Sequence, residues 1–99
     1  MTHLRISEDA LHDINEGFLF YEAQQPGLGD YFATCLRADI EGLRLTAGVH
    51  RVVYRDYHRL LSRVFPYGIF YTRLDDEVAV WAVIDLRRDP DWIRTRLNR

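Results

Sequence analysis

The chain has 99 residues, which is enough for one folded domain and too few for two. Its apolar and charged fractions are those of a globular protein, and it has no run of about 20 apolar residues that would cross a membrane. The net charge of −2 argues against a broad nucleic-acid-binding surface, because such surfaces are strongly basic. We therefore expect one domain over residues 1–99.

The charge is unevenly distributed along the chain. Residues 1–50 carry three arginines against eight acidic residues (net −5), whereas residues 51–99 carry ten arginines against seven acidic residues (net +3). There is no lysine. Arginine recognises carboxylates and phosphates with a planar, bidentate guanidinium group. The second half is therefore suited to an anionic partner, although the same arginines would also solvate a sheet face and pair with nearby acids.

Cysteine usage and the first residues indicate the compartment. The single Cys35 has no partner for an internal disulfide, and residues 1–5 show no signal-peptide pattern. Both observations predict a cytoplasmic protein. Cys35 falls in an apolar helical pattern, so we interpret it as a core residue rather than a catalytic thiol.

The first half predicts a short strand followed by two helices. Residues 4–6 form the strand, and Ser7 is a good N-cap for the helix after it. The apolar face of that helix has the members Leu11, Ile14, Phe18 and Tyr21. Residues 24–29 break the helix, and a second helix is predicted over 30–47, with Gly48 just after its end. Two helices joined by a short loop should pack as an antiparallel hairpin.

After Gly48 the hydrophobic period changes from about 3.6 to about 2, which predicts strands. We expect strands over 51–54, 59–65, 68–74 and 78–84, a turn at 56–58 and a break at Pro66. The 78–84 segment is apolar on both faces, as in a central strand. Asp89 and Pro90 begin a last helix. The predicted fold class is α+β: an N-terminal helical hairpin packed on a small, mostly antiparallel sheet, with a short C-terminal helix.

Three motifs in order carry a resemblance to a known family. They are QPGLG (residues 25–29) followed by Phe32, RVFPYGIFY (residues 63–71) and VIDLRRDP (residues 83–90). Together with the order of elements, they resemble the ParE-like branch of the RelE/ParE toxin superfamily over nearly the whole chain.

The resemblance implies a role. Members of this superfamily are usually toxins of type II toxin–antitoxin modules, often described as plasmid stabilisation proteins, and each is neutralised by a cognate antitoxin. ParE-like members inhibit DNA gyrase by binding, whereas RelE-like members cleave mRNA on the ribosome. We expect a cytoplasmic, cofactor-free gyrase inhibitor; the alternative is a ribosome-dependent mRNA endoribonuclease. A third interpretation is that the chain only binds its antitoxin and is no longer toxic.

The residues at the expected catalytic positions argue against RNA cleavage. The resemblance places a catalytic arginine where this chain has Gly68, and a C-terminal tyrosine where it has Trp92 or Ile93. The remaining catalytic candidates are Arg63, Arg87, Arg88 and His58. Two interpretations remain for His50, His58, Tyr54 and Tyr57. They either form an acid–base pair, or they are exposed side chains of a turn with no catalytic role. The histidines show no metal-ligand spacing, so no metal site is predicted.

Other residues suggest contacts with a partner. Leu19 and Phe20 lie off the main apolar face of the first helix, so they need a second covering surface. One interpretation is that they line a groove for the antitoxin or for a second copy of the chain. The alternative is that the sheet edge or the last helix covers them. Arg63 and Arg73 occupy predicted strand positions, and Arg87 and Arg88 follow the central strand. The predicted target- or antitoxin-binding residues are Leu19, Phe20, Arg63, Arg73, Arg87, Arg88 and Trp92. Alternatively, Arg87 and Arg88 hold the last helix through Asp89 and Asp91. The assembly would be a homodimer or a toxin–antitoxin hetero-oligomer.

Overall fold

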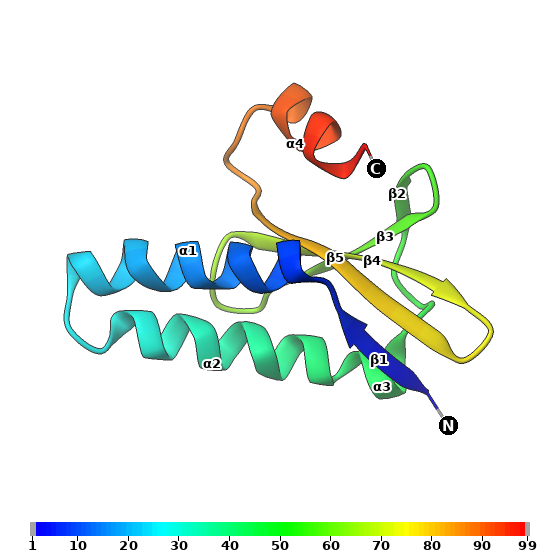
Figure 1. Cartoon of the computed structure of the whole chain (residues 1–99), viewed down its shortest axis with the longest axis horizontal. Helices are drawn as coiled ribbons and strands as arrows, with labels where there is room; N and C mark the ends of the chain where they lie inside the picture. The colour runs from blue at the N-terminus through cyan, green and yellow to red at the C-terminus, as the bar shows by residue number, and fades with distance from the viewer. Residues whose placement is uncertain (1, 99) are drawn as a thin grey trace.

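The computed structural model describes residues 2–98. The elements in chain order are β1 (His3–Ile6), α1 (Glu8–Gln24), α2 (Leu28–Glu41), α3 (Leu43–Thr46), β2 (Val52–Tyr54), β3 (Tyr57–Leu61), β4 (Tyr67–Leu74), β5 (Glu77–Asp85) and α4 (Pro90–Leu97). The strands form one sheet in the order β1-β5-β4-β3-β2 (Figure 1). Only the β1–β5 pair is parallel within residues 2–98, so the predicted mostly antiparallel sheet is confirmed.

The helical hairpin forms as predicted, but α1 is rotated relative to its expected face. Ser7 caps α1 by accepting a 3.0 Å hydrogen bond from the backbone N–H of Ala10. The buried residues of the helix are Ala10, Ile14, Gly17 and Tyr21, whereas Leu11 is exposed. The expected face was wrong at Leu11 because α2 approaches α1 at Gly17, where the Phe32 ring occupies the space of a side chain. Ile14 and Tyr21 are buried as predicted, whereas the contact at Gly17 could not be predicted because a glycine gives no hydrophobic signal.

The bounds of α2 also differ from the prediction. The helix begins at Leu28 rather than residue 30, because the Glu22 carboxylate accepts hydrogen bonds from the N–H groups of Gly27 and Gly29 at its N-terminus. It ends at Glu41 rather than residue 47, and Gly42 separates it from the short α3. Gly48 follows α3 with a φ of +97°, a left-handed conformation that favours glycine.

The strand boundaries between residues 55 and 66 were wrongly predicted. The turn consists of Arg55 and Asp56, with Arg55 at a φ of +51°, and β3 already begins at Tyr57. Residues 62–66 form a loop rather than the end of a strand. Asp39 of α2 holds this loop, since its carboxylate accepts hydrogen bonds from the Ser62 hydroxyl at 3.1 Å and from Arg63 Nε at 3.1 Å.

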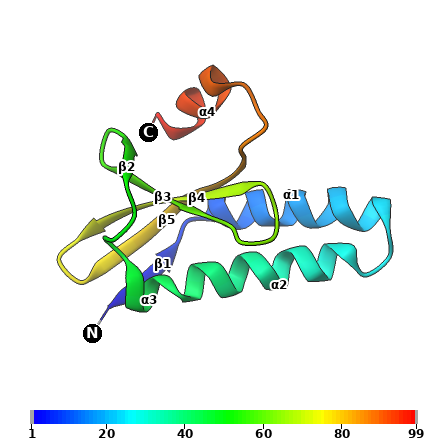
Figure 2. The ribbon, with the colours of Figure 1, turned by 180° about the vertical axis from the view of Figure 1, so that it is seen from behind.

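Both faces of the sheet are covered, as expected for a central β5. The helical hairpin lies on one face and α4 on the other (Figures 1 and 2). A β-bulge places Trp81 as an extra residue between the pairs Phe70–Ala82 and Tyr71–Val80. Leu97 of α4 is buried, and its carbonyl accepts a 2.7 Å hydrogen bond from the Tyr57 hydroxyl. Within residues 2–98, none of the helices combines the length and apolar character needed to cross a membrane.

Candidate partner-binding site

A cleft of about 360 Å³ lies between α1, the end of β5 and α4. We call it the α1/α4 cleft. Its walls are Asp13, Glu16, Gly17, Phe20, Tyr67, Val83, Ile84, Asp85, Arg87, Arg88 and Trp92. Four residues predicted from the sequence to bind a partner therefore come together here from distant parts of the chain: Phe20, Arg87, Arg88 and Trp92.

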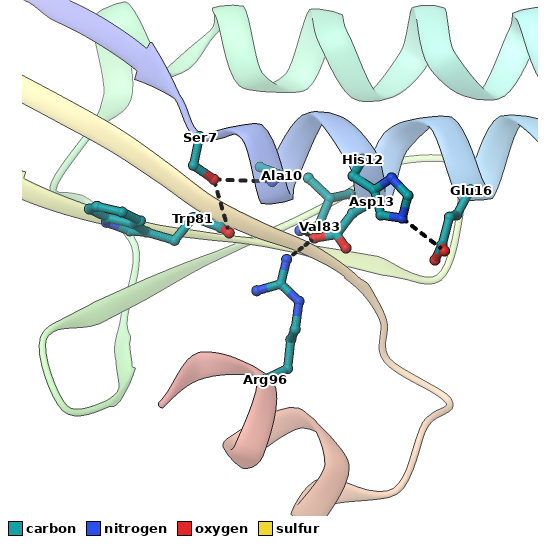
Figure 3. Close-up of polar contacts among 8 residues, drawn as sticks. All are labelled: Ser7, Ala10, His12, Asp13, Glu16, Trp81, Val83 and Arg96. Atoms are coloured by element: carbon teal, nitrogen blue, oxygen red, sulfur yellow. Dashed lines mark hydrogen bonds and ion pairs between the residues drawn. The ribbon is translucent and has the colours of Figure 1, made fainter. Parts of the chain in front are cut away.

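The back wall of the cleft is held by a carboxylate that joins three elements. Asp13 of α1 accepts a 2.9 Å hydrogen bond from the Val83 N–H of β5 and pairs with Arg96 of α4 at 2.6 Å (Figure 3). Burial raises the pKa of the Asp13 carboxyl, although the Val83 N–H and the Arg96 charge oppose this effect. Asp13 thus positions the two walls of the cleft relative to each other.

Arg87 is fixed in place by Asp85. Its Nε and Nη2 atoms donate to the two oxygens of Asp85 at 2.9 and 2.7 Å, and its backbone N–H donates to the same carboxylate at 2.9 Å. The hydrogen bond from the Arg87 side chain is the main reason that the pKa of Asp85 lies below its ordinary value. The carboxylate therefore fixes the position of the Arg87 guanidinium beside the cleft.

The rim of the cleft is aromatic. Phe20 is 53 % exposed and Trp92 is 42 % exposed, which is high for side chains of this size. The guanidinium of Arg88 lies over the Trp92 ring, 4.0 Å from its centroid. Tyr67 is nearly buried at the base, and burial raises its pKa to about 12. Its hydroxyl therefore stays protonated near neutral pH.

The other predicted residues lie outside the α1/α4 cleft. Leu19 is exposed on α1 but does not line it. Arg63 was expected in a strand; it lies in the 62–66 loop, where its exposed side chain pairs with the buried Asp39. The Arg73 guanidinium lies against Gly48, at the other end of the molecule.

His58 belongs to a separate cluster. Its ring stacks on Tyr71 with the centroids 5.0 Å apart, and its Nδ1 is 2.8 Å from the His50 carbonyl oxygen. His50 Nδ1 is 2.6 Å from the Tyr71 hydroxyl. Of the residues considered for an acid–base pair, Tyr57 donates its hydroxyl to the Leu97 carbonyl of α4. Tyr71 is the partner that the sequence analysis missed, because its hydroxyl is brought to His50 only by the register of β4.

Gly68 lies on the face of the sheet that α4 covers. A Cβ atom at this position would lie 2.9 Å from Leu86 Cδ2 and 3.3 Å from Arg59 Cγ. A longer side chain, such as the arginine that the family resemblance implied, would therefore fit here only if Leu86 and Arg59 moved. Arg59 comes from the neighbouring β3 and was not singled out by the sequence, because it looked like an ordinary strand residue.

Arg59 also lines a second cavity, which we call the α4 groove. This cavity has a volume of about 330 Å³ and lies between α4 and the sheet. Its lining residues are Val53, Tyr54, Arg59, Phe70, Leu86, Arg88, Pro90, Ile93, Arg94 and Leu97. Within residues 2–98, no group of three or more histidine, cysteine, aspartate or glutamate side chains is placed to hold a metal ion.

Comparisons with known proteins agree with the fold. The sequence matches no protein-family model and no curated protein. Among solved structures, the chain is similar to one chain of the chromosomal ParDE TA system from P. aeruginosa, with a TM-score of 0.79 and 12 % sequence identity. The similarity covers 86 % of this chain and 96 % of that chain. At this identity the likeness establishes the fold, and the predicted RelE/ParE-like α+β fold is confirmed.

Proposed function

We propose that this chain is the toxin of a type II toxin–antitoxin module, that it acts in the cytoplasm, and that a cognate antitoxin neutralises it. The support is the RelE/ParE-like fold together with the α1/α4 cleft. The fold alone carries no function, because one fold hosts many functions. The cleft supplies the site: exposed aromatic side chains beside positioned arginines are typical of the anchor residues of protein–protein interfaces.

We infer that the toxin acts by binding a protein target, most plainly DNA gyrase, rather than by catalysis. The observation that carries this inference is that the polar groups of the cleft are already engaged. Asp85 is bonded to Arg87, Asp13 to Val83 and Arg96, and Tyr67 holds its proton. Asp13 and Asp85 already hold the arginines and the backbone of the cleft in place, and a protonated tyrosine is no base near neutral pH, so the arrangement favours binding over proton abstraction.

The ribonuclease alternative retains one supporting observation. Arg59 and Arg88 line the α4 groove near Gly68, where they would favour a phosphate group. Tyr54 also lines this groove, although the guanidinium of Arg55 lies over its ring. The groove thus has cations for charge stabilisation and a tyrosine as its proton-transfer candidate.

The deciding experiment is induction of the chain alone in bacteria, with pulse labelling of DNA and protein synthesis during the first minutes. We expect DNA synthesis to fall first, and purified gyrase to lose supercoiling activity when the protein is added. Trp92→Ala should weaken both effects, whereas the control Leu45→Ala, at an exposed position of α3, should not. Protein synthesis falling first, with cleaved mRNA, would overturn the gyrase proposal in favour of the ribonuclease.

A further inference from the structure

The α4 groove is lined by both positively charged and apolar side chains. Arg59, Arg88 and Arg94 line it, together with the apolar side chains of Val53, Phe70, Leu86, Pro90, Ile93 and Leu97. No acidic residue is among the described residues that line it. A ligand that fits must therefore offer both anionic and apolar groups.

Two of these arginines form no direct ion pair within the part of the chain that the structure describes, although the charge of Arg88 also acts on Asp85. Arg94 pairs with Asp91, but none of the carboxylates within residues 2–98 forms an ion pair with Arg59 or Arg88. Arg59 is partly buried, because the missing side chain of Gly68 leaves the space that its stem occupies. A partly desolvated guanidinium without a carboxylate gains more from an incoming anion than one in open water, and its fork geometry suits a carboxylate.

We propose that the α4 groove binds an acidic segment of the antitoxin in which carboxylate side chains alternate with apolar ones. This inference rests on the proposed function for the identity of the partner. Carboxylates of the segment contact Arg59 and Arg88, and its apolar side chains lie on Phe70, Leu86 and Ile93. Because Arg88 lines both the groove and the α1/α4 cleft, a segment in the groove is continuous with one in the cleft.

An acidic peptide fits the groove better than a single-stranded RNA. Proteins hold unpaired bases by stacking them on open aromatic faces. Of the aromatic side chains that line the groove, Tyr54 has the Arg55 guanidinium over its ring and Phe70 is buried.

The test is fluorescence anisotropy on the full chain with three probes. The first is a labelled peptide of alternating glutamate and leucine, the second is the same peptide with glutamine for glutamate, and the third is a labelled single-stranded RNA. We expect the glutamate peptide to bind at least about tenfold more tightly than the glutamine peptide, with an affinity that falls as salt is raised. Equal binding of the two peptides, or tighter binding of the RNA, would overturn the proposal.

Variants locate the site. Arg59→Gln should weaken binding of the glutamate peptide about tenfold, and Arg59→Lys should restore only part of it, because lysine keeps the charge without the bidentate fork. The matched control is Arg37→Gln, which removes one exposed arginine from α2. If Arg59→Gln unfolds the chain, the same comparison is made with Ile93→Glu, which places a repelling charge on the apolar wall. Binding that survives in a folded Arg59 or Ile93 variant contradicts the groove as the site.

A binding measurement with the antitoxin distinguishes failure of the groove proposal from failure of the toxin assignment. If the product of an adjacent reading frame binds the unmodified chain and Arg59→Gln leaves that affinity unchanged, the groove proposal fails and the toxin assignment stands. If the chain neither arrests growth nor binds such a product, the toxin assignment fails. The peptide series then decides by itself whether the groove recognises carboxylates.

Discussion

Asp13 and Arg96 form an ion pair with 2.6 Å between Oδ2 and Nη2, although they stand 83 positions apart in the sequence. The same Asp13 oxygen accepts the N–H of Val83 on β5 (Figure 3). Both side chains are mostly buried, at 14 % and 22 % exposed. The pair therefore connects α1, β5 and α4, and with them the walls of the α1/α4 cleft and the α4 groove.

Removing the Asp13 carboxylate should destabilise the protein measurably. Asp13→Ala leaves the Val83 N–H and the Arg96 guanidinium without their acceptor, so we expect a loss of about 2–4 kcal/mol in the free energy of unfolding. Asp13→Asn should cost less, because an amide oxygen can still accept from Val83 and pays no penalty for a buried charge. Urea denaturation gives these values. The control is His12→Ala, which removes an exposed partner of Glu16 and should change stability by less than about 0.5 kcal/mol. Equal effects of Asp13→Ala and His12→Ala would contradict this role.

The contact of α1 with α2 depends on Gly17. A Cβ at this position would collide with the Phe32 ring, which is fully buried. Gly17→Ala should therefore destabilise the chain by about 1–3 kcal/mol through overpacking, even though alanine is the better helix former. Asn15→Ala, at an exposed position of the same helix, should be neutral or stabilising by a few tenths of a kcal/mol. Thermal unfolding of the two variants compares them directly, and a more stable Gly17→Ala protein would refute the close packing.

Glu22 determines where α2 begins. Its two oxygens accept hydrogen bonds from Gly27 N–H at 3.0 and 3.1 Å, and one also accepts from Gly29 N–H at 2.9 Å. Glu22→Ala should cost about 1–2 kcal/mol, because it removes the acceptor and a negative charge at a helix N-terminus. Glu22→Gln should cost about half as much. Hydrogen exchange of the amides at the start of α2 should speed up in both variants. The comparison variant is Glu41→Ala, because its exposed ion pair with Arg44 contributes only about 0.5 kcal/mol or less to stability. If the amides at the start of α2 remain protected from exchange in Glu22→Ala, Glu22 is not the cap.

These contacts show where the sequence was sufficient. Ser7 and the Asp89-Pro90 pair act on their own helix, so their local signals predicted the starts of α1 and α4 correctly. The start of α2 was wrong because Glu22 caps it from the preceding helix. The end of β3 was wrong because Asp39 of α2 holds Ser62 and Arg63 in a loop. The gathering of Phe20, Arg88 and Trp92 depends on the placement of α4 on the sheet, which no local pattern encodes.

His50 and Tyr71 give the chain a dependence on pH. Burial raises the pKa of Tyr71, and its hydroxyl lies 2.6 Å from His50 Nδ1 while it accepts the Gly48 N–H at 3.0 Å. The tautomer of His50 decides which of these two groups donates the hydrogen bond, so the bond by itself does not fix the charge of the ring. Burial, and then the charge of His58, lower the pKa of His50 below its ordinary 6.5.

The sign of the effect follows from proton binding. Above about pH 7.5 neither the folded nor the unfolded chain protonates His50 appreciably, and its contribution to stability is fully present. As the pH falls below that value, the unfolded chain binds a proton that the folded chain resists, so the free energy of unfolding decreases until the pH has passed through the lowered pKa of His50. The expected result is a smaller loss of stability between about pH 7.5 and about pH 5 in His50→Gln than in the unmodified protein. His58→Gln should raise the pKa of His50 toward 6.5 in an NMR titration, because the neighbouring charge that opposes protonation is gone. A pKa of His50 at or above 6.5 in the unmodified protein would show that burial and the His58 charge do not hold the neutral form.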